Sequence, residues 1–574
     1  MIDFKSRIAE IIAATEIGLT PAEVRAMIEV PQDSKMGDFA FPCFRLAKTM
    51  RKAPQLIAAD VAARIADNEL FSSVQQVNAY VNMFLDKAAF AKELVTAVTE
   101  EGANYGRSNG GAGRTVIVEY SSPNIAKPFH IGHIRSTVIG NAIYKLYDAV
   151  GFNVVRINHL GDYGTQFGKM IVAYRKWGSE EELAHDPIKT LLKYYTRFHE
   201  EAAEHPELND EAREAFVRLE AGAPEEVALW EKFRALSLAE FNRVYDMLGI
   251  TFDSYAGESF YSDKMPRFIE ELKEKGLLVQ SQGAQIVDLE PYGMTPAMIT
   301  KSDGSSLYVT RDIAAAVYRK EHYDFYKCLY VVASQQNLHF KQWKKVLELM
   351  GYEWQKDCIH VPFGLVSLAD GDDIKMMSTR EGRVVFLEDV LTTAVDKTAE
   401  IMRQKNAKDV DIDTVSREVG IGAVIFQELS NNRIKDYVFD WNNVLNFDGE
   451  TGPYVQYTHA RACSVLRNAG VDVNKLSVND IDFSYLTIPS AYELIKLIYR
   501  VPEVVVDAAD KYEPSILTRH LVDIAQAFNK FYHDEHILVD DEAERSAKLA
   551  LVNASRIVIA NCLGLLGIKA PERM

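Results

Sequence analysis

The stretch TVIVEYSSPNIAKPFHIGHIRSTVIGNAIYKLYDAVGFNVVRINH, residues 115–159, decides the fold. It starts with TVIVEY (115–120), a β-rich apolar run typical of a buried strand, and continues through a polar loop that contains prolines. From about Gly132 to Val150 apolar residues recur at the period of a helix, and Gly151 ends this helix before the strand-like NVVRINH (153–159). Strand, turn, helix and strand predict a βαβ unit in a parallel sheet, with a nucleotide at its switch point.

Two histidines lie where the first strand passes into the helix. His130 and His133 flank Gly132 at the predicted helix N-terminus, where free N–H groups and the helix dipole favour anions. Each imidazole can donate to a phosphate oxygen, and Gly132 lets an adenine ring lie against the backbone. Lys127 adds a positive charge three residues upstream. The alternative is a coincidental His-x-x-His pair with metal-ligand spacing. The position of the two histidines between strand and helix favours phosphate chemistry over this alternative.

A second polar segment, DGDDIKMMSTREGRVV (370–385), follows a predicted strand. Lys375, Ser378, Thr379 and Arg380 are candidates to hold the β- and γ-phosphates, on a glycine-bearing loop of the kind that closes over phosphates. Taken alone, the segment favours a charged surface turn. Its place after the histidine motif favours the phosphate-binding interpretation.

The rest of the chain predicts three domains. GRSNGGAGR (106–114) is a linker that separates an N-terminal domain (1–112) from a catalytic domain (113–389). Charged helical sequence at about 176–248 interrupts the catalytic domain as an insertion, and residues 390–574 are helical almost throughout. Further strand-like runs are VQQVNAYVNMFLD (74–86), AQIVDL (284–289), SLYVTRD (306–312), CLYVVAS (328–334) and CIHVPFGLVS (358–367).

Composition predicts a soluble cytoplasmic protein. The 574 residues are 48% hydrophobic and 25% charged, and the chain is too long for one core. Five dispersed cysteines favour neither a disulfide framework nor a zinc site and fit a reducing compartment. We expect no signal peptide, no run able to span a bilayer and no metal held by the protein. The net charge of −18 does not by itself indicate a nucleic-acid partner.

HIGH at 130–133 and MSTREG at 377–382 resemble the two motifs of class I aminoacyl-tRNA synthetases. Longer strings resemble one family among them, the arginyl-tRNA synthetases, from VPQDSKMGDFAFPCFRLAK (30–48) to the C-terminal helices. The strings are VEYSSPNIAKPFHIGHIRSTVIGNAIY (118–144), INHLGDYGTQFGKM (157–170), LYVTRDIAAAVYR (307–319), YVVASQQNLHF (330–340) and GPYVQYTHARACSVL (452–466).

The resemblance implies an arginine–tRNA ligase. Such an enzyme uses ATP with Mg²⁺ to form arginyl-adenylate, passes arginine to the 3′ end of tRNA(Arg), and needs bound tRNA to form the adenylate. The implied fold is α/β and multidomain. It has a Rossmann-like parallel-sheet catalytic domain with a helical insertion, an α+β N-terminal domain that contacts tRNA and an all-α anticodon-binding domain. A monomer is expected, because no stretch resembles a dedicated dimer interface.

The resemblance also assigns residues to ATP. His130, Gly132 and His133 bind it, together with Met377, Ser378, Thr379 and Arg380 of the second motif. The general class I loop reads Lys-Met-Ser-Lys-Ser, and this chain has Met376 and Thr379 where that loop has its two lysines. In the family a lysine before HIGH is the substitute, which makes Lys127 catalytic here beside the two histidines. Lys375 is the alternative.

Selecting arginine over lysine requires a carboxylate and oriented neutral acceptors around a planar guanidinium. The resemblance places Tyr308 and Asp312 at the guanidinium, with Gln336 close by and Glu119 as a second carboxylate. The alternatives for Asp312 are a salt bridge to Arg311 or a helix cap. Ser122, Asn124 and His133 are implied around the α-amino and carboxylate groups of the substrate.

The tRNA contacts implied by the resemblance lie in two places. The C-terminal string interleaves aromatic and basic groups, which suit unpaired bases and phosphates, although aromatic residues at helical spacing also pack in cores. These candidates are Tyr454, Gln456, Tyr457, His459 and Arg461, with Tyr80 and Asn82 in the N-terminal domain. Two rival functions remain. A small-molecule nucleotidyltransferase would lack the helical C-terminal region, and a non-catalytic relative would usually lose one of the two motifs.

Overall fold

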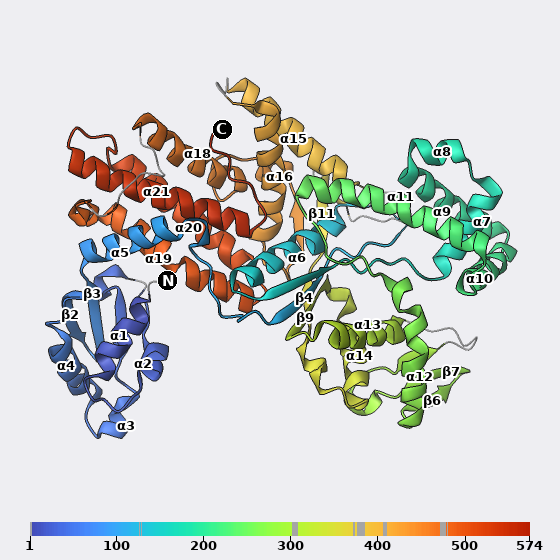
Figure 1. The fold of residues 1–574 in the computed structure, drawn as a ribbon, viewed down its shortest axis with the longest axis horizontal. Coiled ribbons are helices and arrows are strands. Elements are labelled where there is room, and N and C mark those ends of the chain that lie inside the picture. Colours follow the sequence, from blue (N-terminus) through green and yellow to red (C-terminus); the bar gives the residue numbers. More distant parts are fainter. Residues whose placement is uncertain are drawn as a thin grey trace. The chain divides into compact units, whose positions relative to one another are not determined.

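A computed structural model describes all residues except 1–2, 32, 126, 128, 301–307, 371–372, 376–384, 406–409, 471–477 and 479 (Figure 1). The chain packs as two compact units. Unit 1 comprises Met1–Gly106, Thr458–Pro502 and Asp523–Asn561, and unit 2 comprises Arg107–Tyr457, Glu503–Val522 and Cys562–Met574. The three-domain division drawn from the sequence differs from this grouping and stays a prediction.

Unit 1 contains an antiparallel sheet in the order β1-β3-β2. The single strand-like stretch at 74–86 forms two strands, because Asn78 adopts a left-handed backbone (φ 53°) and reverses the chain. The backbone N–H of Phe4 donates to the Tyr499 hydroxyl at 3.2 Å, which ties the N-terminal helix to the C-terminal helices of this unit. The strands are β1 (Phe39–Pro42), β2 (Phe71–Val77) and β3 (Tyr80–Leu85), and the helices are α1 (Phe4–Ala13), α2 (Pro21–Met27), α3 (Leu46–Met50), α4 (Pro54–Ile65) and α5 (Lys87–Glu101).

Unit 2 is built on the predicted parallel sheet, in the order β10-β9-β4-β5. Helix α6 (Gly132–Ala149) connects β4 to β5 and α14 (Asn337–Leu349) connects β9 to β10, so the chain winds in opposite directions from the middle of the sheet. The switch point therefore lies at the carboxyl ends of β4 and β9. The strands are β4 (Thr115–Glu119), β5 (Asn153–Ile157), β9 (Lys327–Ala333) and β10 (Cys358–Phe363).

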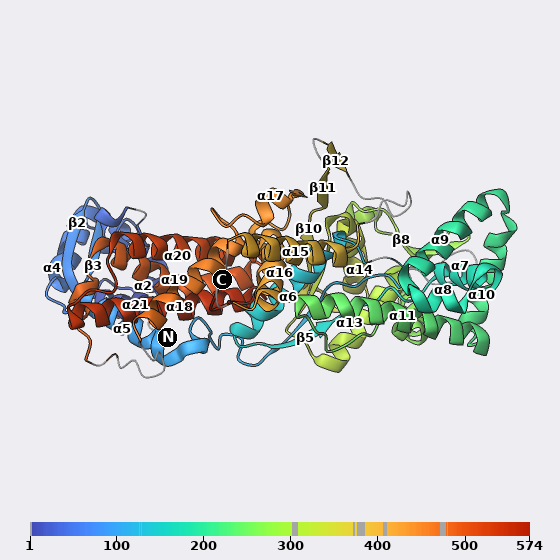
Figure 2. The same cartoon turned by 90° about the horizontal axis from the view of Figure 1, so that it is seen from above.

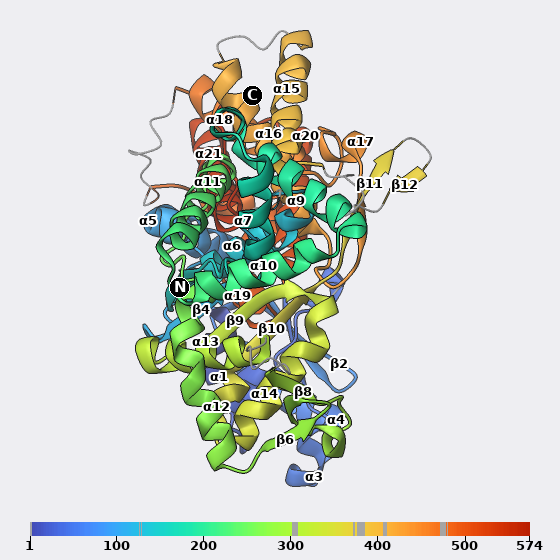
Figure 3. The same cartoon turned by 90° about the vertical axis from the view of Figure 1, so that its right-hand side faces the viewer.

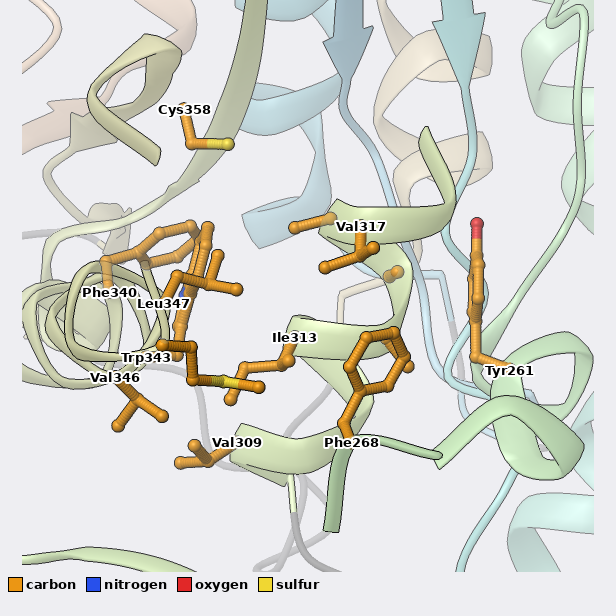
Figure 4. Packing of buried hydrophobic residues seen from close by; sticks show 14 of the residues in the cluster. Tyr261, Phe268, Val309, Ile313, Val317, Phe340, Trp343, Val346, Leu347 and Cys358 are labelled. Atoms are coloured by element: carbon orange, nitrogen blue, oxygen red, sulfur yellow. The ribbon is translucent and has the colours of Figure 1, made fainter. Parts of the chain in front are cut away.

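Helix α13 (Tyr308–Tyr323) packs with α14 on one side of this sheet, while α6 lies on the other (Figure 1). Val309, Ile313 and Val317 of α13 point toward Trp343 and Leu347 of α14 in a buried core (Figure 4). On the α6 side a Cβ on Gly140 would lie 2.2 Å from the Tyr120 Cβ, so only glycine lets α6 approach the end of β4 this closely.

Two strand predictions in this region need correction. The strand predicted at SLYVTRD (306–312) is wrong from Tyr308 onward, where α13 starts, and residues 306–307 lie outside the described residues. The alanine-rich turns that follow and the apolar face buried on α14 favour the helix over the local β propensity of Tyr308, Val309 and Thr310. AQIVDL (284–289) does contain a strand, but it belongs to a separate antiparallel sheet of β6 (Leu278–Ser281), β7 (Ala284–Val287) and β8 (Ala297–Thr300).

The insertion is helical, as predicted, and begins earlier than residue 176. It consists of α7 (Thr165–Trp177), α8 (Glu180–His185), α9 (Pro187–Glu204), α10 (Glu207–Glu220) and α11 (Pro224–Leu248), and α12 (Met265–Glu274) follows it. CIHVPFGLVS supplies two strands of different sheets, β10 and β11 (Val366–Asp370). The latter pairs with β12 (Asp373–Lys375) and β13 (Tyr437–Phe439). Strands β11 and β12 stand out from the rest of unit 2 (Figures 2 and 3).

The C-terminal third is helical, as predicted, apart from β13. Helix α21 meets the length and hydropathy of a membrane span, which corrects the expectation that the chain has no such run, but 67% of the qualifying window is buried inside the protein. A core helix of a soluble protein has these properties. The helices are α15 (Leu387–Gln404), α16 (Ile412–Ser430), α17 (Trp441–Val444), α18 (Gly452–Asn468), α19 (Pro489–Asp510), α20 (Ser515–Asp534) and α21 (Glu542–Leu565).

Candidate active site

The two histidines of the HIGH motif lie together at the start of α6. Their ring centroids are 4.1 Å apart, and the backbone N–H of His130 donates to Nδ1 of His133 at 3.1 Å. The N–H of Gly132 donates to Nδ1 of His130 at 3.1 Å, which fixes that ring on the first turn. Ser121 and Ser122 before the motif both have left-handed backbones (φ 68° and 48°), a strained pair of the kind that collects at functional sites.

Both imidazoles are neutral near pH 7. Burial lowers the pKa of His130 to about 4 and that of His133 to about 3, and the positive charge of Lys127 contributes to both depressions. The Lys127 ammonium therefore lies within electrostatic reach of both rings, and it is 5.9 Å from the Tyr195 ring centroid. A neutral imidazole still donates one N–H to a phosphate oxygen, while the positive charge at this turn comes from lysine.

The loop before the motif is tied to the loop after β5. Asn124 forms a bridge with Gly161, where a Cβ would lie 2.0 Å from the Asn124 Oδ1, so a larger residue at 161 would force the Asn124 side chain to move. The N–H of His159 donates to the Ser122 Oγ at 3.2 Å. Ser122 and Asn124 therefore lie against the loop that follows β5, on the segment that leads to His130 and His133.

Three carboxylates lie near this edge, each with a basic side chain as its partner. The Glu119 Oε2 is 2.5 Å from the Arg319 guanidinium in a pair that is almost fully buried. Glu258 binds Arg311 at 2.7 Å. We call these two pairs, with Asp312 and its partner, the carboxylate cluster.

Asp312 bonds to the imidazole of His339. Both alternatives for Asp312 from the sequence are therefore wrong. Arg311 pairs with Glu258, and Asp312 lies in the second turn of α13, beyond the cap position.

His159 lies between the parts of this cluster. It is half-buried, and desolvation lowers its pKa against the opposing charges of Glu119 and Asp312. The Arg319 guanidinium approaches the His159 Nδ1 at 3.3 Å. Tyr308 is exposed, with Arg311 5.0 Å from its ring centroid, and Gln336 is exposed just after β9. Glu119, Tyr308, Asp312 and Gln336 thus surround one edge of the sheet.

The second motif is only partly described. Met377, Ser378, Thr379 and Arg380 lie outside the described residues. Lys375 is the last residue of β12, where it pairs with Leu368 of β11. Their proposed contacts with phosphate stay predictions. Among the described residues, no group of three or more histidine, cysteine or acidic side chains is arranged to hold a metal ion.

The candidate tRNA residues divide by burial. Asn82 is 2% exposed, and Gln456 and His459 are also buried, so in this structure their side chains do not reach the surface. The Gln456 amide instead donates to the backbone oxygen of Lys569 at 2.8 Å. On α18, residues 456 and 459 share the inner face, while Tyr454, Tyr457 and Arg461 follow the spacing of the outer face.

The remaining candidates are Tyr80 and Arg461. Tyr80 is half-buried and packs edge-on against Phe44, with ring centroids 5.4 Å apart. Arg461 bonds to Asn529 and lies 5.3 Å from the Tyr532 ring centroid.

Sequence reasoning missed the cationic partners of the cluster and one anchor of α6. Arg319 and His339 both occur in strings that it singled out, but periodicity does not reveal which cation meets which carboxylate. The anchor is Arg135, fully buried, whose Nε bonds to Glu428 at 2.7 Å. The Arg135 guanidinium also donates to three backbone oxygens next to β11 and β13, so it fixes the HIGH helix to these strands.

Family profiles cover most of the chain. A profile described as tRNA synthetases class I (R), catalytic domain, matches residues 94–441. One described as DALR anticodon binding domain matches 455–574, and one described as Arginyl tRNA synthetase N terminal domain matches 3–85.

Relatives that match over the full length of the chain indicate the same family as the profiles. A curated protein of Clostridioides difficile (strain 630), named arginine–tRNA ligase, is 58% identical over 574 residues, which is 100% of both chains. One of the same name from Halothermothrix orenii is 56% identical over the same length. The solved structure of the Thermus thermophilus arginyl-tRNA synthetase superimposes with a TM-score of 0.80 at 25% identity and full coverage of both chains.

Proposed function

The chain belongs to the arginyl-tRNA synthetase family, and from that premise we propose how its own residues carry out the reaction. The reaction is the ATP-dependent ligation of L-arginine to tRNA through an arginyl-adenylate. The residue assignments are supported by the carboxyl end of β4, because Glu119 of the carboxylate cluster ends this strand and the loop after it leads to Lys127 and the neutral histidines. Phosphate chemistry and guanidinium recognition are both possible there without a protein nucleophile.

In the first step the arginine carboxylate attacks the α-phosphorus of ATP, and pyrophosphate leaves. His130 and His133 donate hydrogen bonds to phosphate oxygens, and Gly132 leaves room for the adenine. Lys127 supplies positive charge as negative charge moves onto the departing pyrophosphate. Met377, Ser378, Thr379 and Arg380 hold the outer phosphates, and Mg²⁺ enters bound to ATP, in keeping with its preference for phosphate oxygens.

The guanidinium of arginine binds the exposed end of α13. Tyr308 and Asp312 are one helical turn apart, which brings a hydroxyl and a carboxylate to one planar cation. Glu119 adds negative charge from the floor of the site. Gln336 lies close to the guanidinium. Ser122, Asn124 and His133 surround the α-amino and carboxylate groups, which leaves the substrate carboxylate directed at ATP.

In the second step the terminal ribose of tRNA(Arg) attacks the acyl carbon. Tyr454, Tyr457 and Arg461 on the outer face of α18 contact the anticodon region, and Tyr80 contacts the tRNA elbow. The domains are 1–112 for the tRNA elbow, 113–389 for catalysis and 390–574 for the anticodon. The protein works as a monomer in the cytoplasm, without a membrane.

A substitution in the arginine site tests this assignment. Asp312→Asn removes a charge-assisted hydrogen bond of about 1.5–3 kcal/mol, so arginine affinity should fall by about ten- to 150-fold with tRNA charging retained at saturating arginine. Asp324→Asn, which removes an exposed carboxylate from the end of the same helix, is the matched control. Unchanged arginine affinity in Asp312→Asn, with the control also unchanged, would remove Asp312 from the site.

A further inference from the structure

The two carboxylates assigned to arginine differ in the cation that each already holds. Glu119 is paired with Arg319, whose guanidinium is fully buried and stays charged at every pH at which the protein is folded. Asp312 is paired with His339, a group that can lose its charge. The Asp312 side chain is 31% exposed and that of His339 is 23% exposed, against 8% for Glu119, so only the Asp312 pair is open to an incoming ligand.

We propose that in the enzyme without substrate protonated His339 holds the Asp312 carboxylate that the guanidinium of arginine takes, so that arginine binding expels a proton from His339. This rests on the proposed role of Asp312 in binding the guanidinium. At Asp312 the guanidinium of arginine replaces the imidazolium of His339, so the total charge around the carboxylate stays the same. Arginine brings a positive charge to Asp312, the imidazolium N–H bond of His339 breaks, and solvent buffer takes the proton.

Replacing the charge of His339 by that of arginine is more favourable than placing both charges on Asp312. Two cations on one half-buried carboxylate repel each other, and a neutral imidazole removes that repulsion without moving the helix that carries it. Burial lowers the pKa of His339, but the hydrogen bond and charge of Asp312 outweigh this, so the pKa lies above its usual 6.5. His339 is therefore largely protonated at and below that pH in the empty site, and arginine must compete with the proton there.

Two further histidines and one further carboxyl group lie near the Asp312–His339 pair. His360 on β10 faces His339, and His159 faces Asp312. Burial lowers the pKa of both, so they stay neutral through the neutral range. Glu258 also lies near Asp312, and burial raises its pKa to about 7 against the opposing charge of Arg311. Glu258 is thus the one rival proton donor among these neighbours.

The test counts protons released when arginine binds to the full-length enzyme. Calorimetry in buffers of different ionisation heat, between about pH 6 and about pH 8, should show proton release. As the pH rises toward the His339 pKa, the arginine dissociation constant should fall by about tenfold per pH unit, and above that pKa it should level off. His339→Gln keeps a neutral hydrogen-bond donor and should give a flat profile, with affinity at low pH equal to or better than that of the parent enzyme.

Control variants separate the explanations. His322→Gln changes an exposed histidine on α13, the helix that carries Asp312, and should leave the profile intact. A parent enzyme that binds arginine with no proton release, while Asp312→Asn is weakened, overturns the exchange and leaves the proposed function standing. Retention of the profile in His339→Gln with its loss in Glu258→Gln overturns it in favour of Glu258. Normal arginine binding by Asp312→Asn removes Asp312 from the arginine site and overturns the exchange with it.

Discussion

Replacing Lys127 by alanine should slow adenylate formation while leaving arginine affinity unchanged. Neither HIGH histidine carries positive charge near pH 7, because burial lowers the pKa of His130 to about 4 and that of His133 to about 3. Pyrophosphate nevertheless gains negative charge as it leaves. Lys127 is a cation whose charge reaches both rings, so its loss is felt in the transition state and hardly in the bound arginine.

The expected magnitude follows from what the lysine does. A preorganised donor at developing charge is worth about 2.7–4 kcal/mol, which is a loss of about 10²–10³ in turnover. If Lys127 only packs against Tyr195 or pairs with a surface carboxylate, the cost stays under about 1 kcal/mol, or less than about a sixfold change. The losses of turnover that the two interpretations predict therefore differ by more than a factor of ten.

The assay is single-turnover formation of arginyl-adenylate with saturating ATP, arginine and tRNA. Lys127→Arg should recover part of the rate, because it restores the charge on a side chain of different shape. Lys193→Ala removes an exposed lysine of the insertion that pairs with Glu182 at 3.0 Å, and it should be unaffected. A Lys127→Ala enzyme with a normal rate, alongside an impaired Lys375→Ala enzyme, would refute the reasoning and move the role to the loop.

Three further predictions concern the frame around the site and tRNA. Glu428→Ala leaves the buried Arg135 guanidinium without its carboxylate partner and should lower the unfolding free energy of unit 2 by about 3–5 kcal/mol in a denaturant titration. A loss near zero would contradict the anchoring of α6 by this pair. Tyr457→Ala should weaken tRNA binding by about 1–3 kcal/mol in a filter assay, whereas Gln456→Ala should lower thermal stability instead. The reverse pattern would mean that the inner face of α18, and not its outer face, contacts tRNA. Arginine-dependent ATP–pyrophosphate exchange should require tRNA, and full exchange without it would contradict an induced fit.

Much of the catalytic domain follows from the sequence because local patterns there agree with the fold. The apolar run at 115–120, the helix from Gly132 and the strand at 153–157 each have one stable solution once they pack as a βαβ unit. The HIGH turn could be located for the same reason, since a strand that passes into a helix puts the first helical turn at the carboxyl edge of the sheet.

Burial and charge partners did not follow from the sequence. Asn82, Gln456 and His459 occur in strings similar to a tRNA-binding family, yet all three face inward. Polar residues of this kind are chosen by hydrogen bonds made across the fold, as between Gln456 and the chain near its C-terminus. The partnership of Glu119 with Arg319 likewise joins residues far apart in sequence, and no local period encodes it.

The helix at α13 changes what the arginine site can do. If residues 306–312 formed a strand, Tyr308 and Asp312 would be separated by four residues of about 3.3 Å each, or about 13 Å, too far apart for one guanidinium. On a helix they lie one turn apart, with Cβ atoms about 5–6 Å from each other. Two turns further along the same stripe comes Arg319, which holds Glu119. One helix therefore carries the hydroxyl and the carboxylate that we propose for the guanidinium, and it also carries the buried cation that pairs with Glu119.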